Sequence, residues 1–150
     1  MRKAFLVATT ALLVAFVFQF AFAAVGAFTK PGGEGAYILH SVTGSAIIPG
    51  LTLLTIVLAV LAKAPGRLVG LTALPLGLVV LQALLAMLAN ASADAGGTST
   101  PFGLVIAGLH ALNGIIAVHV VVSVHQAARK LAGSASADTA PVAVRESEPV

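Results

Sequence analysis

The sequence predicts an all-α membrane protein: a bundle of four transmembrane helices with both termini on the cytoplasmic side. Of its 150 residues, 59% are hydrophobic and only 9% are charged, whereas charged residues make up about a quarter of a typical soluble domain. Four runs without Asp, Glu, Lys or Arg are each long enough to cross about 30 Å of hydrocarbon. The lipid bilayer is therefore the first partner that we expect.

The charge and the missing cysteines exclude other classes. The eight Lys and Arg residues flank the apolar runs instead of forming a patch, so we expect no nucleic acid partner. Without cysteine there are no disulfides, thiolate-bound metals or thiol catalysis. The apolar runs contain no set of nucleophile, base and carboxylate that could form a catalytic site. The sequence therefore gives little support for enzymatic activity, although it does not exclude it.

The first helix is expected at about residues 4–28, directly after Arg2 and Lys3. The same start resembles a signal peptide, with residues 21–23 as a cleavage site. We favour an uncleaved helix, because the run exceeds the usual ~7–15 apolar residues of a signal peptide and contains Gln19.

The second helix is expected at about residues 37–61, after a loop rich in glycine. Pro49 and Gly50 interrupt it, which predicts a kink or local unwinding near its middle. A short basic turn at residues 63–67 then leaves the second and third helices as an antiparallel hairpin.

The third helix is expected at about residues 68–90, with Pro75 as a second potential kink. The fourth is expected at about residues 102–128, after a loop of small residues and a proline at the first helical position. These helices form a transmembrane domain of residues 1–130, and residues 131–150 are expected to be a disordered cytoplasmic tail.

Basic residues near the helix ends indicate the orientation in the membrane. Only Lys30 lies on one side, and the others lie on the opposite side: Arg2, Lys3, Lys63, Arg67, Arg129 and Lys130. The positive-inside rule therefore places both termini in the cytoplasm of a multi-pass protein of the bacterial plasma membrane.

Two histidines inside the apolar runs are the candidate functional residues. Each belongs to a His-x-x-x-Gly motif, His40 with Gly44 and His110 with Gly114, and a glycine four residues on lies one helical turn away on the same face. Asn113 flanks the second motif. Because hydrocarbon does not solvate ionisable groups, intramembrane histidines suggest a functional site.

The order of polar residues is repeated. Gln19 precedes His40 by 21 residues, and Gln82 precedes His110 by 28. All four lie roughly 6–13 Å inside the outer ends of their helices. This pattern predicts two similar hairpins related by a pseudo-two-fold axis.

The face of the fourth helix that carries His110 is lined by Gly103, Ala107, Gly114 and Ala117. Such a stripe of small residues either lets helices approach closely or leaves a slot for a flat ligand. His119 lies on the opposite face, outside this site, and His125 lies near the cytoplasmic end, where it needs no special role.

These residues favour one b-type haem between the second and fourth helices, with His40 and His110 as ligands to its iron. The remaining site residues would relieve contact with the porphyrin or supply hydrogen bonds around it: Gly44, Gly114, Asn113, Gln19 and Gln82. The function would be electron transfer near the outer face, with a redox partner or a larger membrane complex.

Two other functions stay open. The histidines can simply hydrogen-bond to neighbouring polar side chains and stabilise the bundle, as in a structural or accessory membrane subunit. The kinked helices and intramembrane polar groups also allow transport of protons or a small solute, although no Asp or Glu lies inside the apolar runs.

Residues 1–130 resemble a family of small uncharacterised actinobacterial four-helix membrane proteins. Three segments carry the likeness: Gln19 with Gly26-Ala27-Phe28, Leu39-His40-x-x-x-Gly44, and Leu109-His110-x-x-Asn113-Gly114. More distantly, the chain is similar to four-helix membrane cytochromes b of the cytochrome b561 and haem A synthase-like kinds. That similarity implies haem held by His40 and His110, and at most one haem, because the first and third helices contain no histidine.

Overall fold

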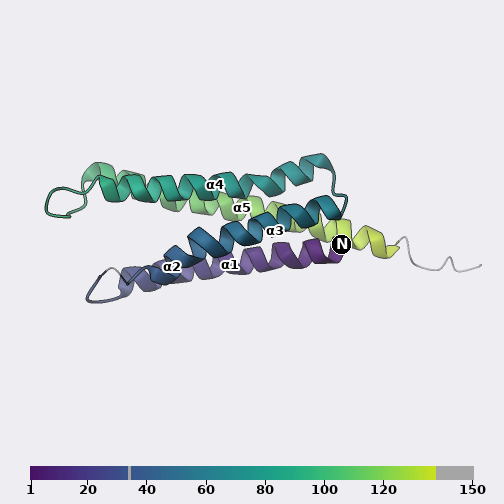
Figure 1. The fold of residues 1–150 in the computed structure, drawn as a ribbon, viewed down its shortest axis with the longest axis horizontal. Helices are drawn as coiled ribbons and strands as arrows, with labels where there is room; N and C mark the ends of the chain where they lie inside the picture. Colours follow the sequence, from purple (N-terminus) through teal and green to yellow (C-terminus); the bar gives the residue numbers. More distant parts are fainter. Residues whose placement is uncertain (34, 138–150) are drawn as a thin grey trace, which may run out of the picture.

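The computed structural model describes residues 1–33 and 35–137 and is helical throughout its regular elements (Figure 1). The elements are α1 (Arg2–Phe28), α2 (Ile38–Val42), the π-helix η1 (Thr43–Ile47), α3 (Ile48–Leu61), α4 (Gly66–Ala91) and α5 (Pro101–Ala137). Because α2, η1 and α3 run on without a break, the described residues form four helices long and apolar enough to cross a membrane. The predicted all-α fold with four helices able to span a membrane is confirmed.

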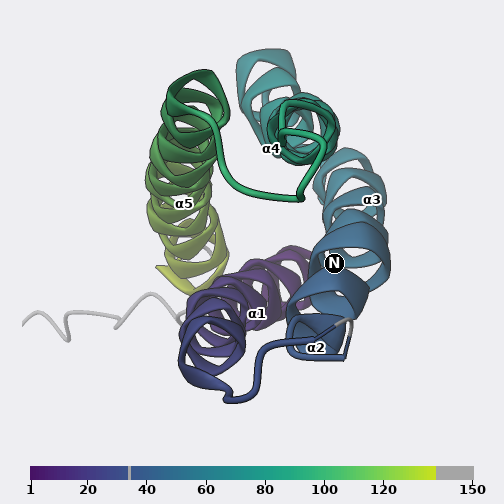
Figure 2. The same cartoon turned by 90° about the vertical axis from the view of Figure 1, so that its left-hand side faces the viewer.

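The four spans form a ring in which each packs against two neighbours. The contacts run from α1 to α3, from α3 to α4, from α4 to α5 and from α5 back to α1, as the end-on view shows (Figure 2). Helices on a diagonal of the ring, such as α2 and α5, make no backbone contact along their described lengths. A side chain from α2 can therefore meet one from α5 only across the centre.

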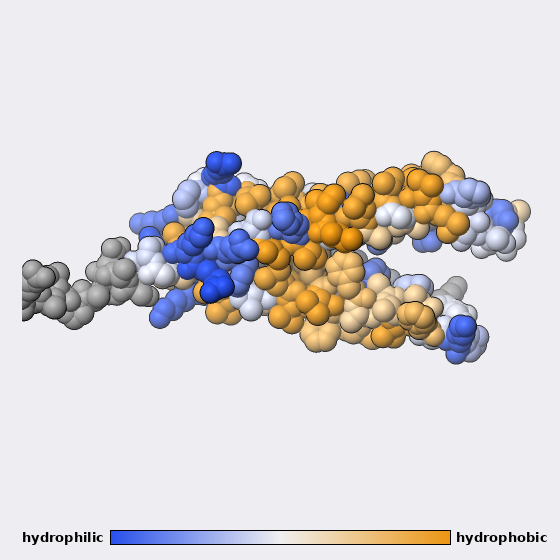
Figure 3. Space-filling model, turned by 180° about the vertical axis from the view of Figure 1, so that it is seen from behind, coloured by the Kyte–Doolittle hydropathy of each residue, from blue (hydrophilic) through white to orange (hydrophobic). Residues whose placement is uncertain are grey.

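Two clusters of buried apolar side chains hold the ring together. The first contains Leu12, Ala15, Phe16, Ile48, Ala117 and Val121, and the second contains Phe5, Ala59, Ala62, Val124 and Ala128. Alanines on three of the four spans let the backbones approach closely, and packing of this kind drives helix association in lipid. Large apolar side chains cover the outside as a belt between hydrophilic ends (Figure 3).

The two hairpins separate at one end, which we call the distal end, where residues 29–37 and 92–100 connect the helices. There α2 packs against α1 but not against α4 or α5 over its described residues. Figure 3 shows the resulting notch between the hairpins, with hydrophilic side chains visible where it ends. The bundle is thus closed toward the chain termini and open at its distal end.

The local unwinding expected near Pro49 takes the form of the π-helical turn. The Ile48 N–H donates to the carbonyl oxygen of Thr43, five residues earlier. Proline has no N–H and its ring displaces the carbonyl of the preceding turn, so a wider turn accommodates it without breaking the helix. The other proline, Pro75, is buried within α4, which continues through it.

The last helix is longer than the sequence predicted. It continues to Ala137, so residues 131–137, expected to begin the tail, are helical. Leu131 packs against the second apolar cluster and Ala132 is buried, which gives this extension a tertiary contact that an isolated tail lacks. The rest of the predicted tail, residues 138–150, lies outside the described residues.

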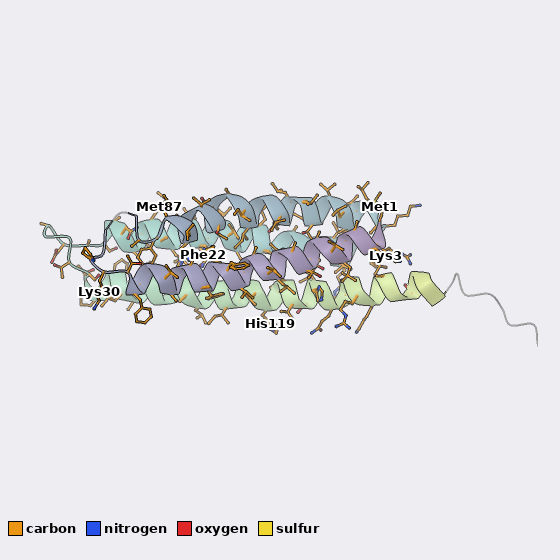
Figure 4. The ribbon with its side chains drawn as sticks, turned by 90° about the horizontal axis from the view of Figure 1, so that it is seen from below. Met1, Lys3, Phe22, Lys30, Met87 and His119 are labelled. Atoms are coloured by element: carbon orange, nitrogen blue, oxygen red, sulfur yellow. The ribbon has the colours of Figure 1, made fainter. Side chains whose placement is uncertain are left out.

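The basic residues lie at the ends of the bundle, as expected. Met1 and Lys3 lie at the terminal end and Lys30 at the distal end (Figure 4). Lys63 and Arg67 lie at the short turn between α3 and α4, which is at the terminal end (Figure 1). Between these ends, the four long apolar runs contain no Asp, Glu, Lys or Arg.

Candidate functional site

Four polar residues, one from each span, meet in the interior. Gln19 comes from α1, His40 from α2, Gln82 from α4 and His110 from α5. The centroids of the two imidazole rings lie 6.3 Å apart, with the ring planes tilted by 53°. The structure therefore brings together the two histidines that the sequence singled out, across a diagonal of the ring where the backbones do not touch.

Each histidine is held by the glutamine of its own hairpin. The Nδ1 atom of His40 lies 3.0 Å from the backbone oxygen of Gln19, and the Nδ1 atom of His110 lies 3.0 Å from that of Gln82. Because a carbonyl oxygen only accepts, each Nδ1 carries the proton and donates. When the ring is neutral, Nε2 then keeps a lone pair, the form in which imidazole binds a metal.

The two glycines of the motifs accommodate the glutamine side chains. A Cβ atom added to Gly44 would lie 2.7 Å from Nε2 of Gln19, and one added to Gly114 would lie 3.2 Å from Nε2 of Gln82. The neighbour of each glycine is thus an amide of the same hairpin, in the space that the sequence analysis assigned to a porphyrin. The repeat extends to this packing, so the contacts of histidine, glutamine and glycine correspond in the two hairpins.

Asn113 distinguishes the second hairpin from the first. Its side-chain amide donates to Oε1 of Gln82 at 2.7 Å and to the backbone oxygen of Leu78 at 2.9 Å. The position that corresponds to Asn113 in the first hairpin is Thr43, which is buried. The Gln82 amide is therefore fixed by a side chain that the first hairpin lacks.

In the first hairpin the glutamine amide contacts the histidine ring instead. Nε2 of Gln19 lies 3.3 Å from Nε2 of His40, so the amide N–H donates to the ring's lone pair. Oε1 of Gln19 is buried and has no hydrogen-bond partner among the described residues. An unpaired buried acceptor is costly, which marks this amide as incompletely satisfied.

An aromatic contact positions His40 from the distal side. The Tyr37 ring meets the His40 ring edge to face, with centroids 6.3 Å apart and planes 78° apart. Tyr37 also covers Gly26, where an added Cβ would lie 2.7 Å from the ring atom Cε1. Gly26 therefore lets the tyrosine lie flat against α1 beside the site.

The stripe of small residues on α5 serves close packing. Gly103 lies against the end of α4, where an added Cβ would be 3.3 Å from the backbone oxygen of Ala89. Ala117 is fully buried in the first apolar cluster. Of the two uses that the sequence allowed for this stripe, these two positions show close helix approach.

The remaining histidines lie outside the site. His119 is exposed and points away from the bundle, as expected from its face of the helix (Figure 4). The Nδ1 atom of His125 lies 3.1 Å from Oγ1 of Thr9, which itself donates to the backbone oxygen of Leu6 at 2.8 Å. Sequence reasoning missed this contact, because a threonine bonded to its own helix is equally compatible with a lipid-facing position.

The donor set limits the chemistry. The described residues contain no group of three or more His, Asp or Glu side chains that could hold a metal ion. What they offer is a pair of neutral imidazoles on facing helices, which suits two axial positions of a planar cofactor or a hydrogen-bonded core.

Comparison with known protein families gives a match to one part of the chain. Residues 19–90 match a family of unknown function (DUF6220). This segment contains Gln19, His40, Gly44 and Gln82, and ends before α5. Searches of curated proteins and of solved structures gave no match. The chain is thus a multi-pass membrane protein whose function has to be inferred from its site.

Proposed function

We propose that the protein binds one b-type haem between its two hairpins, with His40 and His110 as the two axial ligands, and that it transfers electrons near the distal face. The observation that carries the proposal is the pairing of the two rings across the centre of the ring of helices at 6.3 Å. A metal ion takes imidazole nitrogens at about 2 Å, which places the centroids of two opposed rings roughly 6 Å apart.

The protonation state of the histidines supports the same function. In both rings Nδ1 donates to a backbone oxygen and leaves Nε2 as the metal-binding atom. A hydrogen bond of this kind fixes the ring orientation and raises the basicity of the ligand. Both histidine rings are oriented in this way, which is the arrangement that two ligands of one iron would need.

The notch between the hairpins would let a planar cofactor reach the two histidines. Both histidines are half-buried instead of enclosed, and the hairpins diverge toward the distal end. A planar ring entering from that end would lie between the hairpins. To reach iron, His40 must release the amide of Gln19, which now contacts its Nε2 atom. The Gln82 amide, which Asn113 holds beside Gly114, would also have to move, so a porphyrin requires a rearrangement of both glutamine side chains.

The haem would supply one-electron redox chemistry, and the chain would hold it near one surface of the bilayer. With the basic end in the cytoplasm, the distal end faces the outside of a bacterial plasma membrane. A single haem at that depth favours exchange with a redox partner at the outer face, or a role as a subunit of a larger membrane complex.

A second candidate is a structural or accessory subunit without a cofactor. The observation that favours it is that every hydrogen bond of His40 and His110 is made to the glutamine of its own hairpin. Such bonds stabilise membrane helices by about 0.6–2 kcal/mol each. Transport ranks below both, because the apolar runs contain no carboxylate that could carry protons.

The test is a reduced-minus-oxidised optical spectrum of the protein purified in mild detergent from cells supplied with haem. The expected result is a sharp α-band of a low-spin b-type haem, with one haem per chain. A flat spectrum from folded protein would reject the haem and leave the structural role.

A further inference from the structure

We infer that two copies of this protein associate in the membrane along the outer face of α5, where His119 of each copy hydrogen-bonds to His119 of the other. The inference does not depend on the proposed haem, because His119 points away from the interior of the bundle (Figure 4). It concerns a histidine that the candidate site leaves out.

His119 lies well inside the apolar length of α5. Arg129, the next basic residue along the chain after His125, follows ten residues later, which is about 15 Å along a helix. A hydrocarbon layer of about 30 Å that ends near Arg129 therefore has His119 close to its middle.

The ring of His119 has no polar partner in its own chain. Each of the other three histidines contacts a polar atom of another helix, and His119 alone is exposed. The Ser123 hydroxyl, one turn further on, donates to the His119 backbone oxygen at 3.0 Å and not to the ring. A neutral imidazole has one donor and one acceptor, and hydrocarbon satisfies neither. A polar group on a neighbouring membrane helix would satisfy them.

His119 belongs to a continuous row of side chains on the outer face of α5, which we call the outer stripe. Its members follow one another at alternating spacings of four and three residues: Val105, Leu109, Leu112, Ile116, His119, Ser123 and Gln126. All are exposed except Ser123, which is half-buried. Side chains with this period form the seam between two parallel helices of a left-handed coiled coil. The outer stripe is about 32 Å long, so it extends through the whole hydrocarbon layer.

A second copy of the chain is the occupant that fits the outer stripe. Two copies in one membrane have the same orientation, so their α5 helices run parallel and a two-fold axis brings equal positions together. At His119 the ring N–H of one copy meets the ring acceptor of the other. Ser123 and Gln126 also both donate and accept, so polar meets polar and apolar meets apolar along the stripe. The outer stripe is therefore complementary to itself.

The position that follows Gln126 in this series is Lys130, which would bring two like charges together. Lys130 is exposed and lies beyond Arg129, at the terminal end of the bundle. Water and salt screen the repulsion between charges at such a position. The polar contacts that favour association lie deeper, where no such screening weakens them.

The test is disulfide cross-linking, which is unambiguous because the chain contains no cysteine. Ser123→Cys adds one thiol in the outer stripe, and Thr10→Cys adds one on the outside of α1, at a similar distance from the terminal end. The two positions are matched, because each hydroxyl bonds to the carbonyl oxygen four residues earlier in its own helix. Both full-length variants are reconstituted into phosphatidylcholine vesicles, oxidised with copper phenanthroline and separated on a non-reducing gel.

The expected result is a cross-linked dimer of Ser123→Cys and a monomer of Thr10→Cys. Addition of His119→Leu to Ser123→Cys should weaken dimerisation roughly three- to twentyfold, the effect of losing one hydrogen bond between membrane helices. His119→Gln should retain the dimer, because an amide also donates and accepts. The measurement is the lipid dilution at which half of the chains are cross-linked, and circular dichroism checks that each variant is folded.

Three outcomes would overturn the inference. A monomer of Ser123→Cys, or equal cross-linking of Ser123→Cys and Thr10→Cys, would reject association along the outer stripe. Equal dimerisation with and without His119→Leu would reject the bond between the histidines. Cross-linking of Ser123→Cys to a different protein in native membranes would reject the second copy as the occupant. Because no readout involves haem, these results are independent of the test of the proposed function.

Discussion

Asn113 and Gln82 are joined by a 2.7 Å hydrogen bond between α5 and α4 that has no counterpart between α1 and the second span. The bond breaks the symmetry of two hairpins that otherwise match in their His–Gln contacts and in the glycine under each amide. The same amide nitrogen of Asn113 also reaches the Leu78 backbone oxygen at 2.9 Å. One side chain thus ties α5 to two successive turns of α4.

The first prediction concerns that side chain. Asn113→Ala should lower the free energy of unfolding by about 1–3 kcal/mol, because the partly buried Oε1 of Gln82 loses its donor. Asn90→Ala, at an exposed position near the end of α4, is the control and should change stability little. Unfolding in detergent, followed by circular dichroism, measures both. Equal effects of the two substitutions would show that the Asn113 bond carries no stability.

The second prediction concerns the ligands. If the protein binds haem as proposed, His40→Ala and His110→Ala should each abolish the low-spin spectrum, because each removes one of the two proposed ligands. His119→Ala should keep the wild-type spectrum, because this histidine is exposed on the outer face of α5. Optical spectra and pyridine haemochrome stoichiometry measure the three variants. Loss of haem in His119→Ala alone would refute the assignment of the ligands.

The third prediction compares two glycines. Gly77→Ala should raise stability by up to about 1 kcal/mol, because alanine favours the helix and an added Cβ would meet nothing within 4 Å. Gly114→Ala should lower it, because its Cβ would lie 3.2 Å from Nε2 of Gln82, and Asn113 prevents that amide from moving away. Thermal unfolding in detergent compares them. A gain of equal size at both positions would contradict the packing of Gln82 on Gly114.

Much of the fold could be predicted from the sequence, because the helices are determined by the length of the apolar runs and the absence of charged residues in them. A run without charge that is long enough to span the bilayer has few alternatives to a helix, since hydrocarbon satisfies no backbone hydrogen bond. The unwinding near Pro49 follows equally from the missing N–H. The end of α5 was predicted too early, because its last turns depend on tertiary contacts of Leu131 and Ala132 rather than on local pattern.

The site could be predicted only in outline. The repeated order of glutamine, histidine and glycine indicated which residues meet, and His40 and His110 do meet. The acceptors of both Nδ1 atoms are backbone oxygens, which leave no signature in a sequence. Asn113 and Thr43 stand at corresponding positions of the two hairpins. The sequence does not show that Asn113 donates to Oε1 of Gln82 while Oε1 of Gln19 has no partner among the described residues, because that depends on how the side chains point.

The last prediction concerns the contact between Thr9 and His125 near the terminal end. Thr9 is completely buried, and its hydroxyl links α1 to the ring of His125 on α5 at 3.1 Å. Thr9→Val keeps the volume but removes the oxygen, so it should lower stability by about 0.6–1.7 kcal/mol, from the average to the largest value for hydrogen bonds between membrane helices. Thr10→Val is the matched control, because Thr10 is exposed and bonds only within its own helix.

A double-mutant cycle decides whether the Thr9 effect comes from this contact. If it does, Thr9→Val should cost little in a His125→Leu background, since the hydroxyl no longer has a partner across the helices. Additive losses would place the effect of Thr9 in its packing instead. Because both residues lie far along the chain from His40 and His110, the optical spectrum should be the same in all these variants as in the wild type. That result would separate packing at the terminal end from the candidate site at the distal end.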